Sequence, residues 1–159
     1  MISDINSIAA LSGRLLGVDF GDRRTGLAIS DATGFLAGGI GNVSPGGIVA
    51  TAREVAKVAR EQGAVAAVVG LPRNMDGSEG ARADRCREFA KLLAEEAGIP
   101  VTMTDERLTT VAASRYLNET NTRGKRRKAV IDSLSAEIIL QNTLDRIANI
   151  RSKITIADT

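Results

Sequence analysis

The sequence predicts a single α/β domain with a mixed five-stranded sheet, three antiparallel strands followed by parallel strands, and helices on both faces. Three short apolar runs separated only by turn residues open the chain, which is typical of an antiparallel meander. Apolar runs then alternate with helical patterns, as in parallel strands joined by crossovers. The chain has 159 residues, 43% apolar and 25% charged, which is enough for one domain with its own core.

The antiparallel part of the sheet is predicted first. Arg14 to Phe20 (RLLGVDF) is a short apolar run with an acid near its end, the pattern of a buried strand with a functional tip. Two further strands are expected at residues 25–30 and 35–43. The segments that join the three strands are short turns, so neighbouring strands should run antiparallel.

The parallel part of the sheet is expected to follow, with helical crossovers. Residues 48–62 carry apolar side chains at helical spacing, and the glycine that follows them is a common helix end. Residues 64–70 (AVAAVVG) are apolar throughout, which suits a parallel strand covered on both faces. A second helix is expected at 79–97 and a last strand at 100–104.

The rest of the chain is predicted to hold a short helix, a basic loop and a final helix. The short helix is expected at 109–117, the loop at 123–128 and the final helix from about Lys128 to Ala148. We interpret residues 1–13 as a flexible N-terminal leader and 149–159 as a C-terminal tail. Residues 14–148 then form the single domain.

The charged residues restrict the chemistry. The chain contains 21 Lys and Arg, 19 Asp and Glu and no histidine, which excludes Ser-His-Asp and Cys-His catalysis and imidazole zinc sites. The net charge of +2 conceals one basic segment, 123–128 (RGKRRK), with five cations and no acid. Such a cluster attracts phosphate backbones, and a solvated surface loop is an equal interpretation.

The single cysteine and the apolar runs indicate the cellular compartment in which the protein is expected. Cys86 cannot form an internal disulfide, which points to a reducing cytoplasm, and its helical pattern favours a buried filler over a reactive thiol. The N-terminus lacks the basic region of a signal peptide. The apolar run at 64–71 is much shorter than the ~20 residues that cross a bilayer. We therefore expect a cytoplasmic protein with no membrane-spanning segment.

Four acids stand where an α/β sheet binds ligands. Asp19 ends the first strand, Asp105 and Glu106 follow the last, and Asp132 lies near the start of the final helix. Converging carboxylates bind Mg²⁺ or Mn²⁺, and two such ions can activate a water for phosphodiester hydrolysis. Each acid also has a purely structural interpretation. Asp19 could form the turn that follows the strand, and Asp105 and Glu106 could form ion pairs with Arg107. Asp132 could be favoured by the positive end of the helix dipole.

Four segments together resemble the YqgF/RuvX-type family, which is described both as nucleases for the small-subunit rRNA precursor and as Holliday junction resolvases. The segments are LGVDFGDRRTGLAISD (16–31), VGLPRNMDGSEG (69–80), DERLTT (105–110) and the stretch 125–145. The resemblance covers about residues 14–147 and implies a ribonuclease H-like fold. That fold agrees with the order of strands and helices predicted above.

The resemblance also implies site residues. It makes Asp19, Glu106 and Asp132 the catalytic acids, which would hold two Mg²⁺ or Mn²⁺ ions and, through them, an attacking water. The residues expected to contact nucleic acid are Arg23, Arg24, Arg107, Arg123, Lys125, Arg126, Arg127 and Lys128. Asp76 and Asp105 are expected to border the cleft, and which of Asp105 and Glu106 is the second metal ligand stays open.

Several functions stay open at this point. The first is a nuclease for the 5′ end of the 16S rRNA precursor, and the second is a resolvase of four-way DNA junctions, which would favour a homodimer. A non-catalytic nucleic-acid-binding module is a third interpretation. The opening motif also resembles the phosphate-binding hairpin of the actin and sugar-kinase superfamily, but 159 residues cannot supply the two domains that clamp ATP there.

Overall fold

The computed structural model describes residues 2–74, 76–105 and 124–157, and of these the backbone alone for 124–132 and 155–157. Its centre is a mixed sheet of five strands in the order β3-β2-β1-β4-β5. The strands are β1 (Arg14–Asp19), β2 (Thr25–Ser30), β3 (Ala37–Val43), β4 (Ala64–Leu71) and β5 (Val101–Asp105). β1 pairs antiparallel with β2 and parallel with β4, so it forms the centre of the sheet.

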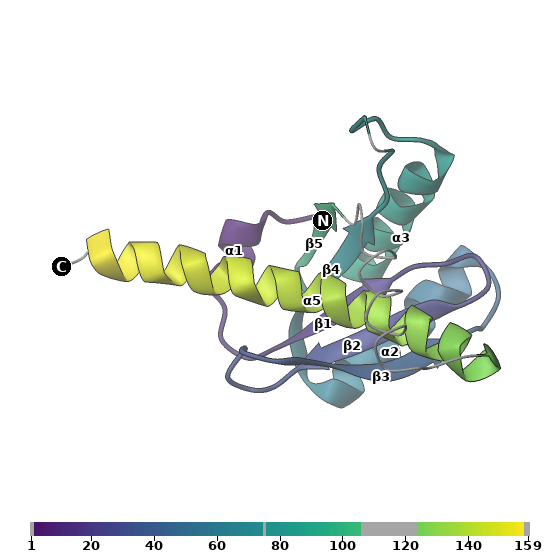
Figure 1. Ribbon diagram of the computed structural model, residues 1–159, viewed down its shortest axis with the longest axis horizontal. Helices are drawn as coiled ribbons and strands as arrows, with labels where there is room; N and C mark the ends of the chain where they lie inside the picture. Colours follow the sequence, from purple (N-terminus) through teal and green to yellow (C-terminus); the bar gives the residue numbers. More distant parts are fainter. Residues whose placement is uncertain (1, 75, 106–123, 158–159) are drawn as a thin grey trace.

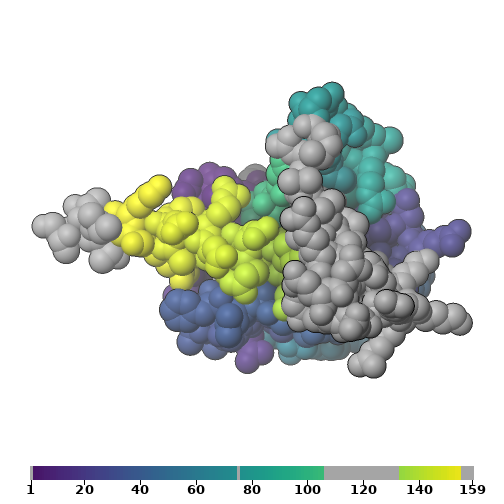
Figure 2. Space-filling model, viewed as in Figure 1, coloured from purple at the N-terminus to yellow at the C-terminus, as the bar shows by residue number. Residues whose placement is uncertain are grey.

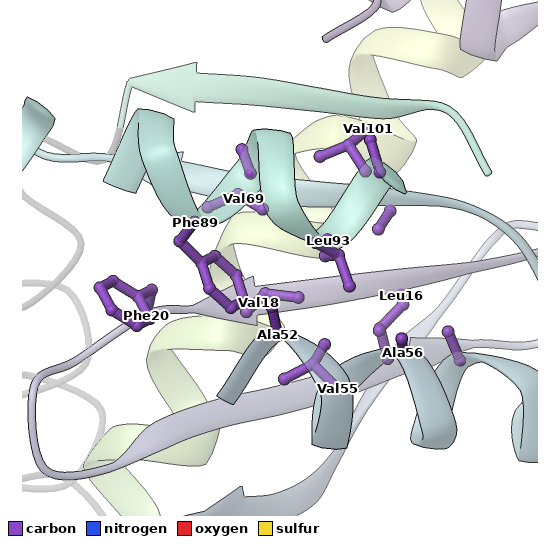
Figure 3. Close-up of a cluster of buried hydrophobic side chains, with 14 of the residues drawn as sticks. Leu16, Val18, Phe20, Ala52, Val55, Ala56, Val69, Phe89, Leu93 and Val101 are labelled. Carbon is purple, nitrogen blue, oxygen red and sulfur yellow. The ribbon is translucent and has the colours of Figure 1, made fainter. Parts of the chain in front are cut away.

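One face of the sheet is covered by α2 (Ile48–Gln62) and α3 (Ala81–Ala97), which contact each other. Both helices end at a glycine in the left-handed conformation, Gly63 and Gly98, where a side chain would be strained. The core beneath them joins Leu16 and Val18 of β1 to side chains of both helices. Figure 3 shows this core, with Phe20 beside Phe89 at one end.

The other face is covered by α5 (Gly124–Ala157), with the short helix α1 (Ile5–Ala9) beside it. Leu15 of β1 and Val68 of β4 are buried against Ile139 and Leu140 of α5. Figure 1 shows α5 lying across the sheet, and Figure 2 shows its C-terminal part standing clear of the body. The sheet is thus covered on both faces, which explains why β4 is apolar throughout.

The fold class and the order of strands expected from the sequence are confirmed. The expected strand at 35–43 begins at Ala37, and the expected helix at 79–97 begins at Ala81. Cys86 is buried in α3, 1% exposed, as expected of a small filler. The expected helix at 109–117 lies outside the described residues.

The expected basic loop is wrong for Lys125 to Lys128, because these residues lie in α5, which begins at Gly124. Lys and Arg are good helix formers, and a run of them is compatible with a helix as well as with a loop. Lys125 to Lys128 therefore lie on the same helix as Asp132.

The two expected terminal segments also differ from the structure. Helix α5 continues past Ala148 to Ala157, and Arg151 donates to the carbonyls of Ala9 and Leu11. In the expected leader, Ser3 donates to the Val101 carbonyl and Asp4 caps α1. Residues 2–9 are therefore attached to the domain rather than flexible, because Ile8 and Ala9 are buried against α5.

In the part of the chain that the structure describes, no helix is long and apolar enough to span a membrane.

Candidate functional site

Asp19 ends the central strand on the face that α5 covers. Side chains alternate along a strand, and Leu15 belongs to the core under α5, so Asp19 shares its face. Asp19 is half-buried and pairs with Gly26 of β2. On the other side Val18 pairs with Val69, so Gly70 is the next position of β4. Both flanking strands present glycine at the level of Asp19, so neither strand covers its carboxylate with a side chain.

Helix α5 runs antiparallel to β1, because Gly17 meets Ala136 and Leu140, while the earlier Leu15 lines a hollow with Leu144 and Ile147. A methyl group placed on Gly17 would meet the Ala136 carbonyl oxygen at 2.8 Å and the Leu140 Cβ at 2.7 Å. Two strand residues span about 6.6 Å, the rise of four to five helical residues. The part of α5 level with Asp19 is therefore about 131–136. Position 132 lies within it, one turn before Ala136 and on the same face of α5.

The turn between β1 and β2 is fixed at both ends. A side chain on Gly21 would collide with the Arg24 carbonyl, so the turn requires glycine there. The Thr25 hydroxyl accepts from the Gly21 N–H at 3.4 Å. The Phe20 ring stacks on Phe89 of α3, with centroids 4.5 Å apart and planes 12° from parallel. This buried pair anchors the residue that follows Asp19 (Figure 3).

Asp105 lies on the opposite face of the sheet from Asp19. Its neighbours two residues apart, Val101 and Met103, both contact the core under α2 and α3. By strand alternation Asp105 shares that face. Its carboxylate lies 4.0 Å from the Arg73 guanidinium. Asp105 therefore shares a face with Arg73 and not with Asp19, and its expected place at the cleft stays a prediction.

Arg73 also connects Asp105 to a second ion pair in the loop before α3. Arg73 lies 3.6 Å from Glu79, which accepts two hydrogen bonds of 2.9 Å from Arg87. The hydrogen bonds from Arg87 hold the pKa of Glu79 below its usual value. These pairs orient the loop that the sequence analysis expected to border the cleft.

Asp76 lies in that loop and shapes its turn. Its Oδ1 accepts from the Ser78 N–H at 2.8 Å and from the Ser78 hydroxyl at 2.6 Å. The loop closes further where the Asn74 N–H donates to the Ser78 carbonyl. These contacts give Asp76 a structural role and leave its expected place at the cleft a prediction.

The expected phosphate contacts are only partly within the described residues. Arg23 is exposed and Arg24 half-buried in the β1–β2 turn. Glu106, Arg107 and Arg123 lie outside the described residues. Among the residues that the structure does describe, no group of three His, Cys, Asp or Glu side chains could hold a metal ion. The metal set expected from the sequence includes Glu106 and the side chain of Asp132, which are not described.

Two further arginines contact the β1–β2 turn and were not candidates in the sequence analysis. Arg82 donates to the Phe20 carbonyl at 3.4 Å, and Arg85 donates to the Asp22 carboxylate at 3.0 Å. Both lie in the first two turns of α3. Their three-residue spacing puts them on one side of a helix, but no local signal says that this side meets the turn.

The comparisons with known proteins identify the family. The model of the RuvX family, described as "Holliday junction resolvase", matches residues 13–146. The chain belongs to the RuvX family. A relative from Myxococcus xanthus, named "Putative pre-16S rRNA nuclease", is 46% identical over 132 residues, which cover 83% of this chain and 87% of the relative. A relative of the same name from Moorella thermoacetica is 43% identical over 84% of this chain and 96% of the relative.

Solved structures support the fold of this RuvX family member. Thermus thermophilus RuvC in complex with a Holliday junction substrate has a TM-score of 0.54 at 16% identity, over 86% of this chain and 96% of that chain. A second Thermus thermophilus RuvC structure has a TM-score of 0.51 at 16% identity, over 85% of this chain and 96% of that chain. The ribonuclease H-like fold expected from the sequence is thereby confirmed, and the RuvX family places the protein among enzymes that act on phosphodiester bonds of nucleic acid.

Proposed function

We propose that this protein is a metal-dependent nuclease that cuts structured RNA and processes the 5′ end of the 16S rRNA precursor. The observation that carries the proposal is the position of Asp19. It ends the central strand between two glycine positions and lies level with position 132 of α5. The names of the relatives support the RNA substrate, and a cytoplasmic location follows from that substrate.

The three proposed acids have the chemistry that suits a hard metal ion. Asp19, Glu106 and Asp132 would supply carboxylate oxygens, which are the ligands that Mg²⁺ and Mn²⁺ prefer. One or two such ions would lower the pKa of an attacking water and stabilise the leaving oxygen. The glycines beside Asp19 put no side chain of β2 or β4 at its level, so these two strands would not obstruct a metal ion and a phosphate bound to it.

The cations near this edge would position the substrate. Arg23 and Arg24 lie in the turn that directly follows β1. The segment Lys125 to Lys128 lies at the start of α5, and that end of the helix points toward Asp19. With Arg107 and Arg123, these residues would contact phosphates on either side of the bond that is cut, and binding would weaken steeply as salt rises.

A second candidate is the resolution of four-way DNA junctions, which the description of the RuvX family favours. This activity needs two symmetric cuts and therefore a homodimer. The two candidates share the same phosphate chemistry, so they differ in the shape of substrate that is bound and not in the catalytic acids.

The test compares two neighbouring acids. Purified protein is incubated with labelled 16S precursor, RNA hairpins and four-way DNA junctions, in Mg²⁺, in Mn²⁺ and in EDTA. Asp19→Asn, Glu106→Gln and Asp132→Asn should each lower cleavage by at least about 100-fold. Asp105→Asn is the matched control, because Asp105 lies on the other face of the sheet, and it should keep most of the activity.

The outcomes separate the candidates. Cleavage of precursor RNA that requires metal and the three acids supports the proposal. Preferential, paired cleavage of the four-way junction would favour the resolvase. If all substrates stay intact, or if Asp19→Asn cuts as fast as the native protein, the catalytic assignment is wrong and the non-catalytic module is favoured.

A further inference from the structure

The surface where α3 meets the β1–β2 turn carries an unusual set of charges. Arg82 and Arg85 reach from α3 to Phe20 and Asp22 in the turn. A hollow of about 210 Å³ lies between them, lined by Phe20, Asp22, Ala81, Arg82 and Arg85. The Arg85 side chain is 48% exposed although it is paired with Asp22. Arg82 is exposed as well, so both side chains keep surface that a bound anion can reach.

The cations that line the hollow outnumber its acids. Two arginines and one aspartate line the hollow, and the adjacent turn adds Arg23 and Arg24. Further from the hollow, Arg73 of the preceding loop and Arg87 of α3 are both paired with Glu79. The residues that line the hollow therefore carry one more positive than negative charge, and Asp84 is the next acid along α3. An excess of this kind attracts phosphate groups.

The hollow lies on the other side of Asp19 from the basic start of α5. Arg82 contacts the carbonyl of Phe20, the residue directly after Asp19. The arginines of α3 are on one face of the sheet and α5 is on the other, with the carboxyl end of β1 between them. Packed layers are about 10 Å apart, so the two basic regions are separated by roughly 20 Å. At about 3.4 Å per nucleotide, this distance corresponds to roughly six nucleotides of a duplex strand.

We propose that Arg82 and Arg85 bind the phosphate backbone of the substrate on the flank opposite to the one held by residues 125–128. The nucleic acid then crosses the carboxyl end of the sheet, with the bond to be cut beside Asp19 and a basic contact on each side. This inference rests on the proposed function, because it concerns the same site and the same substrate class. It also gives Asp22 a role, since its carboxylate orients Arg85 and limits the positive potential of the hollow.

The test measures where and how tightly structured RNA is bound. All variants are made in the Asp19→Asn background, so that the RNA stays intact, and circular dichroism checks their folding. Arg82→Gln with Arg85→Gln should weaken binding of a labelled precursor hairpin by about 10- to 100-fold near 0.15 M salt, from two charge-assisted contacts. The slope of log K against log salt should fall by roughly 1.4–1.8, for two phosphate contacts.

A matched control removes two cations elsewhere on the same layer of helices. The control variant is Lys57→Gln with Arg60→Gln. Both residues lie near the C-terminal end of α2, which directly precedes the start of β4 and is therefore at the other end of the sheet. This control should leave the affinity within about twofold and the slope unchanged. Asp22→Asn should tighten binding several-fold, because it removes the acid of the hollow without removing a cation.

Hydroxyl-radical footprinting shows which part of the RNA backbone each pair of cations protects. A general loss of positive charge would weaken protection everywhere and not on one flank. Arg82→Gln with Arg85→Gln should lose protection on one flank of the bound hairpin, and Lys125→Gln with Arg126→Gln should lose it on the other. If both pairs lose the same flank, or if the α3 pair matches the α2 control in affinity and slope, the inference is wrong.

The same measurements keep this inference separate from the proposed function. With Asp19 restored, the α3 pair should raise KM for precursor cleavage and leave kcat nearly unchanged. If the native protein cuts nothing but the footprint shows two separate flanks, the nuclease proposal fails and the α3 contact stands. If the native protein binds neither RNA nor DNA, both are wrong.

Discussion

The contact between Gly17 and α5 is the most direct test of how the fold positions the proposed active site. Gly17 lies two residues before Asp19, and its backbone is covered by Ala136 and Leu140. In Gly17→Ala the new Cβ would lie 2.7 Å from the Leu140 Cβ, whereas an ordinary contact begins at 3.4 Å. The helix must therefore move away from the sheet by about 0.7 Å, because neither backbone nor a Cβ can rotate aside.

Two effects with different magnitudes should follow from this displacement. Overpacking of this kind costs about 1–3 kcal/mol of the free energy of unfolding. Position 132 lies one turn from the contact, so its distance to Asp19 changes as well. A misplacement near 1 Å can cost about 100-fold in rate, so we expect cleavage to fall by roughly 10- to 100-fold at a temperature where the variant is fully folded.

The assay combines urea unfolding, followed by circular dichroism, with single-turnover cleavage of the precursor RNA. Gly38→Ala is the control, because a methyl group on Gly38 meets nothing within 4 Å. It should change neither property beyond about 0.5 kcal/mol or twofold. If Gly17→Ala unfolds with the same free energy as the native protein, α5 does not pack closely against Gly17. A loss of stability with an unchanged cleavage rate would refute the link from this contact to the catalytic geometry.

Three further predictions concern the elements around the site. Phe20→Ala should cost about 3–5 kcal/mol of unfolding free energy, because it removes a buried ring stacked on Phe89; thermal unfolding that matches the native protein would contradict this. Glu79→Gln should destabilise the protein at pH 7, and because the pKa of Glu79 is lowered in the folded state, the difference from the native protein is full above the unfolded value of 4.5 and shrinks as the pH falls below it. Urea unfolding at pH 7 and pH 3.5 measures the difference in unfolding free energy between the native protein and Glu79→Gln. An equal difference at both pH values would mean that the charge of Glu79 does not stabilise the fold. Arg151→Met should cost about 1–3 kcal/mol and speed hydrogen exchange in α1, because two carbonyls at the end of that helix lose their donor; unchanged exchange would mean that the packing of Ile8 alone holds α1.

Local patterns were sufficient where a short segment determines its own structure. The strand predicted at Arg14 to Phe20 is observed at Arg14–Asp19, and the helix ends before Gly63 and Gly98 were predicted. Apolar runs and glycines that end helices depend little on distant residues. The length of α5 was predicted wrongly at both ends. At its start, the run of basic residues was interpreted as a loop. At its other end, the segment beyond Ala148 contains no glycine or proline that would stop a helix, so the helix continues.

The first helix was missed although its signals are present. Asp4 is a good N-cap residue, and Ile5, Ile8 and Ala9 follow at helical spacing. A helix of five residues is not stable alone and forms here because α5 covers its apolar side. An isolated pattern of this length could not show that a partner surface exists 140 residues further along the chain.

The sequence by itself determined the fold class, the family and the identity of the acids proposed to bind metal, because these depend on local periodicity and on motifs within short segments. The tertiary structure decided which faces meet. It placed Asp19 and position 132 on one face and turned Asp105 to the other, where Arg73 holds it. It also brought Arg82 and Arg85 to residues of the β1–β2 turn that lie 62 and 63 positions earlier in the chain. Strand alternation and helix packing fix these relations, and both depend on register between segments distant in the chain, which no single segment specifies.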